Sequence, residues 1–384
     1  MKTKIYTTIL MIYLSIMSFY FYTHQYYNVD IEAYMGLVYK ITEPEMDIEE
    51  IHKKVYDELA IKKPEIFSYR KSITEAETIG SDSYYYILSK NVKAYEEELE
   101  FFSVKPLYNI INSIFFKLGF SAATSTFLIS IISYVLIIFF MFLFLNKELK
   151  RTELAFAITL LISIFKPILD STRHATPDML GCLLLLLTCY FFIYKKNMIV
   201  TTILAMLTIF TRPEYFIFFS LLLVLILFFR KSFTYKISEI GISYLFITIS
   251  FIIIQLYSKI SWGVLFMNQF TKVQIYPISN PDPFILSHYI NYIKRKIFLE
   301  FNSSYFIILL IFTIVILGNT LYNKHRTDKK PLLVLSFAIA TMISVLIRFL
   351  AFPVLVNRMM VGFYLLIILA ITLYQFSDKK NVNH

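Results

Sequence analysis

The sequence predicts an all-α integral membrane protein with about ten transmembrane helices. Of its 384 residues 57% are hydrophobic, and the mean hydropathy is +0.63, which is more apolar than a soluble domain requires. The apolar runs are continuous rather than alternating, which favours helices over strands. Only eight glycines occur and no glycine-rich phosphate loop is present, so the composition argues against a soluble nucleotide-binding enzyme.

The ten predicted spans are apolar stretches with few internal charges, as a helix in lipid requires. The first, 5–21, follows Lys2 and Lys4 and lacks the small residues of a cleavage site, so we expect it to remain uncleaved. The other nine fall near 122–145, 154–169, 177–194, 198–210, 213–229, 237–257, 304–322, 332–351 and 359–376. Cys182 and Cys189 lie within one stretch and are expected to be buried hydrophobes.

Charge fixes the expected orientation of these spans. With ten spans both termini lie on one side, and the segments of that side carry 16 Lys and Arg against five Asp and Glu. Basic loops stay in the cytoplasm, so we expect both termini there, in a bacterial plasma membrane. Residues 24–104 of the first outer loop carry 17 acids and nine bases, whereas the other outward positions carry 12 bases and five acids. Topology does not require those outward bases.

We expect the whole chain to form a single membrane domain with two long polar segments outside. The first outer loop, 23–105, shows helical spacing of apolar residues over 31–41 and 48–59, which predicts amphipathic helices lying on the membrane surface. An apolar stretch at 106–120 is short for a span, so it is re-entrant or interfacial. The second outer loop, 258–301, is expected to cover the outer face.

Asp30 and Glu32 follow closely after the first span and are the candidate catalytic residues. Asp30 at a helix N-cap and Glu32 in the first turn would both be favourable with the helix dipole. The functional alternative is a general base at the membrane surface, which takes a proton from an acceptor hydroxyl or amine. A single carboxylate suffices when the leaving group is a phosphate, which is already a good anion. Both interpretations remain open at this point.

Basic residues near the outer ends of the spans are candidates for binding a phosphate. Arginine binds phosphate in a bidentate manner, although each residue alone is also explained by contact with lipid headgroups. Thr211 to Glu214 and Thr176 to Asp178 are explained as helix starts, with Thr as cap and Pro in the first turn. The candidate phosphate ligands are Lys105, Arg173, His174, Arg212, Lys272 and Arg358.

Five short motifs occur in an order that resembles a known family. They are Asp30 after the first span, Lys105-Pro-Leu-Tyr, Ala175-Thr-Pro-Asp-Met-Leu, Thr211-Arg-Pro-Glu-Tyr, and Asn357-Arg358 at the start of the last span. The chain thereby resembles the polytopic GT-C glycosyltransferases, such as the protein mannosyltransferase and lipid A aminoarabinose transferase relatives. It departs from them in that Ile31 separates the two acids and Lys105 stands where Arg is commoner. The resemblance implies a polyprenyl-phosphate sugar donor and inverting transfer outside the cytoplasm, with Asp30 as base.

The expected function is therefore transfer of a sugar from a polyprenyl-phosphate donor to a glycan, lipid or protein acceptor, in cell-envelope glycan or glycolipid synthesis. An O-antigen-type polysaccharide polymerase and a lipid-carrier flippase or transporter are the alternatives. We expect contact with membrane lipid and none with nucleic acid. Asp30 and Glu32 also offer hard oxygen ligands to a divalent metal, although the sequence supplies no complete ligand set.

Overall fold

The described part of the chain is helical throughout. The computed structural model describes residues 2–64, 81–229, 235–271, 273–303, 305–322 and 329–377. Apart from one isolated bridge between Tyr26 and His174, these residues form no β-structure. An all-α architecture is therefore confirmed for the described residues.

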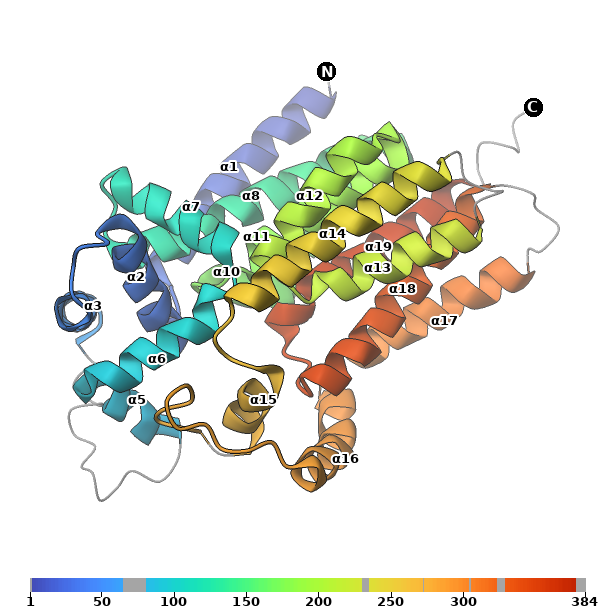
Figure 1. Ribbon diagram of the computed structural model, residues 1–384. Helices are drawn as coiled ribbons and strands as arrows, with labels where there is room; N and C mark the ends of the chain where they lie inside the picture. The colour runs from blue at the N-terminus through green and yellow to red at the C-terminus, as the bar shows by residue number, and fades with distance from the viewer. Residues whose placement is uncertain are drawn as a thin grey trace, which may run out of the picture.

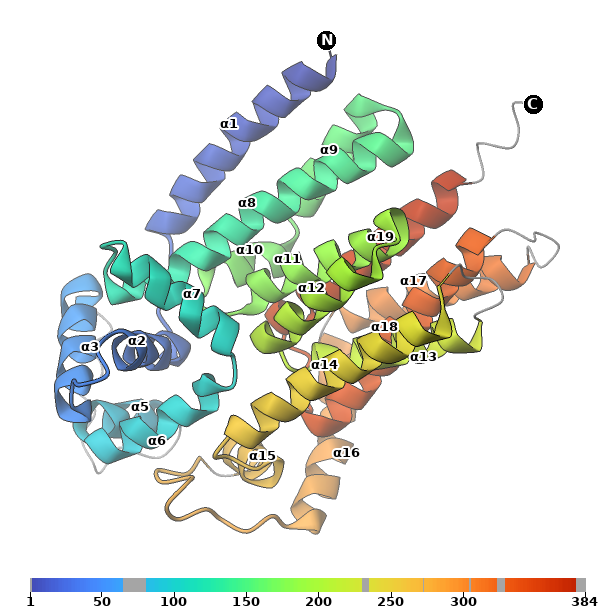
Figure 2. The same cartoon turned by 45° about the horizontal axis from the view of Figure 1, so that its top comes forward.

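Ten helical segments run side by side as the main bundle (Figures 1 and 2). Each coincides with one predicted span, and the start of α1 and the end of α19 lie at the same end of the bundle. The segments are α1 Lys2–Thr23, α8 Ala122–Leu149, α9 Thr152–Ser163 with α10 Lys166–Arg173, α11 Asp178–Tyr190 with the π-helical η2 Phe191–Lys195, α12 Met198–Thr211, α13 Tyr215–Phe228, α14 Ile237–Tyr257, α17 Phe306–Tyr322, α18 Lys329–Ala351 and α19 Asn357–Ser377.

Seven further helices gather at the opposite end of the bundle (Figure 1). Five of them come from the first long polar segment and the short apolar stretch after it, and together they are called the cap. The cap consists of α2 Val29–Thr42, α3 Ile48–Lys62, α5 Ser81–Lys90, α6 Val92–Ser103 and α7 Pro106–Lys117. The second long segment contributes α15 Trp262–Phe270 and α16 Leu286–Ser303. Both polar segments therefore lie at one end, which is called the cap end.

The length and composition of the helices support a membrane protein. Five described helices are long and apolar enough to cross a membrane, and up to seven spans result if each bent helix pair counts as one. The apolar parts of α12, α13 and α19 have only 10–17 residues, less than the roughly 20 that a bilayer requires. A helical membrane protein is thus supported, while the number of ten spans stays a prediction.

The predicted span at 154–169 is not one straight helix. It breaks into α9 and α10, whose axes differ by 56°. Pro167 lies in the first turn of α10, where it has no N–H to donate and restricts the backbone of Lys166. The break turns the polar residues from Asp170 onward across the cap end of the bundle rather than along it.

The expectation that 31–41 forms a helix on the membrane surface is wrong. Every residue from Ile31 to Tyr39 is buried, because α2 packs against α3, α6, α7 and α8. A surface helix would leave one face in solvent. By contrast, α3 keeps the expected pattern, burying Ile51, Val55 and Leu59 and exposing Glu49, Glu50, Lys53 and Asp57. The cap therefore has a hydrophobic core of its own, which continues into α8 and α11.

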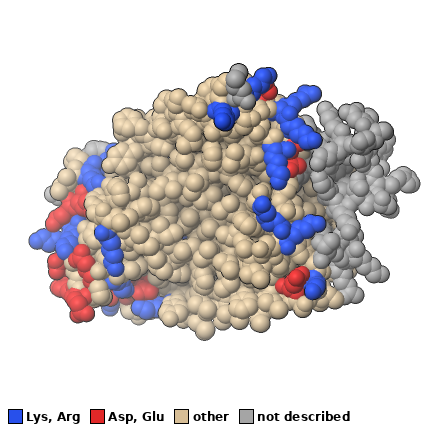
Figure 3. Space-filling model, turned by 90° about the horizontal axis from the view of Figure 1, so that it is seen from above, with Lys and Arg blue, Asp and Glu red and all other residues tan. Residues whose placement is uncertain are grey.

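Charged side chains separate to the two ends of the molecule (Figure 3). The cap end carries both acidic and basic residues, the opposite end is mainly basic, and the broad band between them is almost free of charge on this face. The band has the properties of a surface in contact with lipid. The mainly basic end holds the start of α1 and the end of α19, and it is the end that the loop charges predict to be cytoplasmic.

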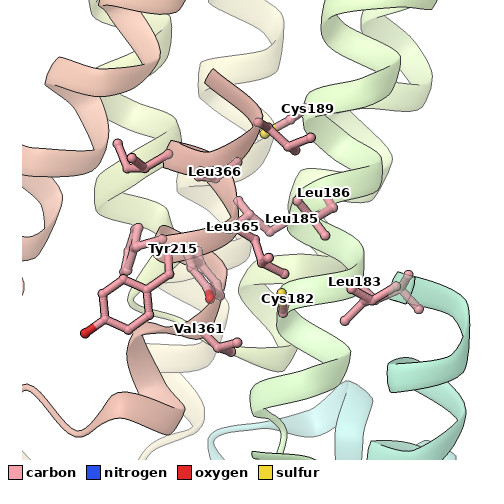
Figure 4. Close-up of a cluster of buried hydrophobic side chains, with 14 of the residues drawn as sticks. Cys182, Leu183, Leu185, Leu186, Cys189, Tyr215, Val361, Leu365 and Leu366 are labelled. Atoms are coloured by element: carbon pink, nitrogen blue, oxygen red, sulfur yellow. The ribbon is translucent and has the colours of Figure 1, made fainter. Parts of the chain in front are cut away.

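The core of the bundle is formed where α11 and α19 meet, at its centre (Figure 4). Cys182 and Cys189 are buried and free there, as expected, beside Leu185, Leu365 and Leu366. Tight packing of this kind fixes the relative positions of the two helices. It thereby fixes Asp178 and Arg358, which lie at their cap ends.

Cysteine labelling tests the orientation. In a background lacking Cys182 and Cys189, single cysteines at the exposed cap-end positions Glu49 and Asn280 are expected to react with a membrane-impermeant thiol reagent in whole cells. A cysteine at Lys150, in the basic turn between α8 and α9, should react only after lysis. The reverse pattern would place the cap in the cytoplasm.

Candidate functional site

Asp30 lies in the first turn of α2 and forms an ion pair with Arg358, the second residue of α19. Arg358 Nη1 lies 2.6 Å from Asp30 Oδ2, and Asn28 Nδ2 donates to the same oxygen at 2.9 Å. The two side chains are 20% and 19% exposed, so the pair is shielded but still reachable. In the described part of the chain no donor contacts Asp30 Oδ1. This second oxygen is therefore open to a hydrogen-bond donor from a ligand.

The expected N-cap role of Asp30 is wrong, since Asn28 occupies the N-cap position of α2. Burial by itself would raise the pKa of Asp30, but the Arg358 guanidinium, aided by the Lys105 ammonium and Asn28, outweighs that effect and lowers the pKa below its ordinary value. Asp30 is therefore a carboxylate throughout the physiological pH range. An ionised carboxylate with one free oxygen has the properties of a general base.

Lys105 is the N-cap residue of α7 and points into the cap core. Its Nζ donates to the Tyr34 hydroxyl at 3.0 Å and lies 4.9 Å from the centre of the Phe102 ring. Burial and the nearby Arg212 lower the pKa of Lys105 to about 8, although Asp30 acts in the opposite direction. Lys105 thus carries a positive charge at neutral pH, in surroundings that favour binding an anion.

Arg212 connects the start of α11 to the start of α13. Its Nη1 lies 2.7 Å from Asp178 Oδ1 and its Nη2 lies 2.5 Å from Glu214 Oε1. The Arg212 and Asp178 side chains are only 6% and 1% exposed. Thr176 Oγ1 donates to Asp178 Oδ2 at 2.7 Å, so both carboxylate oxygens have partners. Because an unpaired buried charge is costly, these residues hold one another in place.

Gly181 allows Arg212 to lie close to α11. A Cβ atom at this position would be 2.7 Å from Arg212 Cγ, which is too short for any carbon–carbon contact. The position therefore requires a residue without a side chain. Glycine lets the guanidinium reach Asp178 across the first turn of α11.

His174 and Arg173 have different environments although they are adjacent. His174 Nδ1 contacts the Asp170 carbonyl at 2.7 Å, and burial lowers the pKa of His174, so the ring is neutral near pH 7. Arg173 donates from Nε to the His24 carbonyl at 2.6 Å and from Nη1 to the Tyr26 hydroxyl at 2.7 Å. Its guanidinium also stacks on the Tyr26 ring at 3.7 Å. Arg173 thereby fastens the segment after α1 to the end of α10.

Glu32 does not join Asp30 in the structure. Glu32 is buried in the cap, where the Tyr56 hydroxyl donates to its Oε2 at 2.9 Å and the Tyr95 hydroxyl donates to its carbonyl at 2.8 Å. A spacing of two residues turns a helical side chain by about 200°, which explains this divergence from Asp30. A structural role is favoured for Glu32. Lys272 lies outside the described residues.

Together the cap end holds a charge cluster, defined as four bases and three acids within electrostatic reach of one another. Asp178, Glu214 and Arg348 belong to it and were not among the predicted site residues. Arg348 Nη1 donates to the Val354 carbonyl at 2.9 Å, in the turn that leads to Arg358. Asp178 and Glu214 were interpreted as helix starts, and an acid at the start of an apolar helix is a signal of a buried basic partner. The charge cluster consists of Asp30, Lys105, Asp178, Arg212, Glu214, Arg348 and Arg358.

A groove of about 640 Å³ lies beside the charge cluster, between the cap and α14. Its lining is mostly apolar, including Leu107, Ile110, Phe210 and Ile253, with Lys40, Lys259 and Glu100 as its charged residues. Val104 and Pro106, which flank Lys105, also line it. The groove is thus an apolar channel that passes the backbone on either side of Lys105 and carries two lysines and one glutamate of its own, a combination that suits an amphipathic anion.

The second long segment bridges the two sides of the cap end. On the cap side, Glu97 accepts hydrogen bonds from the backbone N–H groups of Ile278 and Ser279 at 2.8 and 3.1 Å. On the bundle side, Trp262 Nε1 donates to the Ala351 carbonyl at 2.8 Å, and the Leu355 N–H donates to Glu300 at 2.9 Å. The segment thereby supports the 352–356 turn that positions Arg358.

The residues of the site do not define a metal centre, since no three His, Cys, Asp or Glu side chains converge among those that the structure describes. Comparisons with protein-family models, with curated proteins and with solved structures find no match for this chain.

Proposed function

We propose that this chain is a membrane glycosyltransferase that uses a sugar donor linked to a polyprenyl phosphate and acts on the outer face of the membrane. The observation that carries the proposal is the Asp30–Arg358 pair within the charge cluster, beside the apolar groove. The order of motifs in the sequence supports the same class, as a resemblance to GT-C glycosyltransferases.

Arg358, which pairs with Asp30, is suited to share its hydrogen bonds with a phosphate when one binds. Arg358 holds one oxygen of Asp30, and its guanidinium can share its donors between that carboxylate and a phosphate. Lys105 adds a second positive charge within electrostatic reach of Asp30. A lipid phosphate is a dianion or monoanion at neutral pH, so it would be attracted to this cluster of four bases and three acids.

Asp30 then serves as the general base. In the proposed step, the acceptor O–H donates to the open Oδ1, its oxygen attacks the anomeric carbon, and its proton passes to Asp30. The bond between the anomeric carbon and the phosphate oxygen breaks, and the lipid phosphate leaves with the electron pair. Arg358 and Lys105 stabilise the charge that develops on this leaving group. Attack opposite the phosphate inverts the configuration of the sugar.

The groove explains why a lipid-linked donor is favoured over a soluble one. Its apolar lining includes Val104 and Pro106, on either side of Lys105, and Phe210, which is two residues before Arg212. An apolar chain in the groove would place its terminal phosphate near these bases. A nucleotide would leave the same apolar surface without a partner.

Reaction of purified protein with defined donors tests the proposal. The protein in lipid vesicles would be incubated with undecaprenyl-phosphate sugars or with nucleotide sugars, together with a mixed acceptor extract. Release of free undecaprenyl phosphate, measured by mass spectrometry, is the expected result with at least one lipid-linked sugar. Turnover of a nucleotide sugar in vesicles free of lipid carrier would contradict the proposal.

We expect the pH dependence of sugar transfer to follow the loss of the proton from Lys105. Its pKa of about 8 lies below the ordinary 10.5, so the cation is present below pH 8 and is lost as the pH rises through 8. We therefore expect kcat/KM to fall above about pH 8. Asp30, with its lowered pKa, remains ionised and contributes no change between pH 5 and 9. The Lys105→Arg variant keeps its charge and should lose this decline.

Two controls make the pH experiment specific. Lys117→Arg changes an exposed lysine on the same helix and should leave the profile unaltered. Glu98 is the other cap residue that titrates near this range, since burial raises its pKa to about 7. If the Glu98→Gln variant lost the fall in kcat/KM above pH 8, that fall would be due to Glu98 and not to Lys105.

A further inference from the structure

Helix α16 has an exposed apolar surface at the cap end of the bundle. Leu286, Ile290 and Ile297 are spaced four and seven residues apart, which places them on one face of the helix, and all three are exposed. Near its end, Ile297, Phe298 and Leu299 are consecutive and exposed, and Phe298 is 76% accessible. Exposed apolar residues over more than half of a helical turn indicate surroundings other than water.

The direction of α16 relates it to the lipid-facing surface. It turns by 77° into α17, one of the bundle helices, so the two axes are close to perpendicular. A helix perpendicular to a membrane-crossing helix lies parallel to the membrane plane. The exposed residues Ile307, Ile308 and Ile311 of α17 continue the apolar surface directly after the end of α16.

The charges of α16 are unequally exposed. Lys294 and Arg295 are exposed, one turn before the apolar end. The other two charged residues of the helix, Lys296 and Glu300, pair with each other at 3.1 Å, and Glu300 also accepts the Leu355 N–H. The unpaired charge of α16 is thus positive, and it lies next to the turn whose outward side is formed by Ile297, Phe298 and Leu299.

Contacts with the protein fix the orientation of this surface. The Tyr289 hydroxyl donates to the Leu350 carbonyl at 2.9 Å, and Ile293 is buried beneath the helix. These contacts and the Glu300 bond attach one side of α16 to the α18–α19 turn. The remaining sides are held outward and cannot turn into the protein core.

We propose that α16 lies in the headgroup region on the outer face of the membrane and binds anionic lipid headgroups through Lys294 and Arg295. Its C-terminal turn enters the acyl region beside α17, while the two bases meet lipid phosphates one turn earlier. This arrangement covers the apolar residues and neutralises the bases at the same depth. It is independent of the reaction that the charge cluster performs.

Fluorescence quenching measures this arrangement directly. A bimane label would be placed at Phe298→Cys in a variant lacking Cys182 and Cys189, and the protein reconstituted in phosphatidylcholine vesicles containing phosphatidylglycerol. Quenching by acyl-chain nitroxides on phosphatidylglycerol is expected to exceed quenching by the same nitroxide on phosphatidylcholine by about fivefold to 30-fold, the factors equivalent to about 1 kcal/mol for each of one or two basic residues at an anionic surface. Equal quenching by the two lipids would overturn anionic selectivity.

Paired variants identify the bases responsible. Replacing Lys294 and Arg295 together by Gln should bring the preference for phosphatidylglycerol close to one, with quenching by phosphatidylcholine retained. Replacing the exposed Lys90 and Lys93 of the cap by Gln removes the same charge and should leave the preference unchanged. Loss of the preference in both double variants would attribute it to net charge and contradict the proposed site.

Labels along α16 distinguish an interfacial helix from the alternatives. Bimane at Ile290→Cys should also be quenched, whereas bimane at the exposed His288→Cys, two residues earlier and about 200° around the helix, should be quenched weakly. If the depth of the label in the bilayer, measured by quenching, increased steadily from residue 286 to residue 299, the helix would cross the bilayer. Absence of quenching at residue 298 would place α16 in water, and either result would overturn the proposal.

Discussion

An Asp30→Asn variant is expected to fold and insert normally but to transfer sugar at least about 100-fold more slowly, the usual loss when a general base is removed. The amide keeps the size of the carboxylate but cannot accept a proton. Arg358 loses its ion pair in this variant and becomes more available to the donor phosphate. We therefore expect the loss in kcat, with a KM for the lipid donor that does not rise.

The matched control is Asp47→Asn. Asp47 is an exposed residue of the same polar segment, and its side chain accepts a hydrogen bond from the Glu49 N–H at 2.6 Å as the N-cap of α3. Asparagine also caps helices, so this variant should retain full activity. Glu32→Gln should reduce activity less than Asp30→Asn. Near-normal turnover by a well-folded Asp30→Asn protein in donor-supplied vesicles would refute the assignment of the base.

An Arg212→Ala variant is expected to be destabilised by about 3–5 kcal/mol, because it leaves a buried carboxylate without its partner. The Asp178 side chain is 1% exposed and would retain only the hydrogen bond from the Thr176 hydroxyl. The loss should appear as a large decrease in the melting temperature of the detergent-solubilised protein. Donor binding would weaken as well, but loss of folded protein is expected to dominate.

Two comparisons isolate the cause of that effect. Lys2→Ala removes an ion pair with Glu153 whose side chains are 77% and 50% exposed, and it should not change the melting temperature measurably. The double variant Arg212→Met with Asp178→Leu removes both buried charges and should recover much of the stability, but not the activity. Equal melting temperatures for Arg212→Ala and the wild type would show that this ion pair does not hold the two helices together.

The positions of the bundle helices can be predicted from the sequence, because a helix in contact with lipid needs a continuous run of apolar residues. Where polar residues lie inside a run, the pattern is insufficient. Lys166 and Pro167 divide one predicted span into two helices with a 56° bend. The burial of α2 was not predictable from its own residues. Ile31, Tyr34 and Val38 fit a surface helix equally well, and only contacts with α3, α6, α7 and α8 cover the other side.

The site was partly predictable for a related reason. Lys105, Arg212 and Arg358 each lie at the same end of an apolar stretch, so topology alone directs them to one region together with Asp30. Their partners depend on helix rotation and packing, which the sequence does not specify. Arg173 therefore points to Tyr26 instead of the cluster, and Asp178 joins Arg212 across a contact that Gly181 makes possible.

The Asp30–Arg358 pair joins residues separated by 328 positions, from the segment after the first helix to the start of the last. During synthesis Asp30 emerges early, whereas Arg358 is made only when α19 is produced. Until then the carboxylate lacks the cation that lowers its pKa, and the end of α18 and the 352–356 turn are not in place to receive Trp262 and Glu300. A chain that is terminated early or fails to insert α19 thus has no assembled charge cluster. The proposed activity would therefore require α19 to be in place.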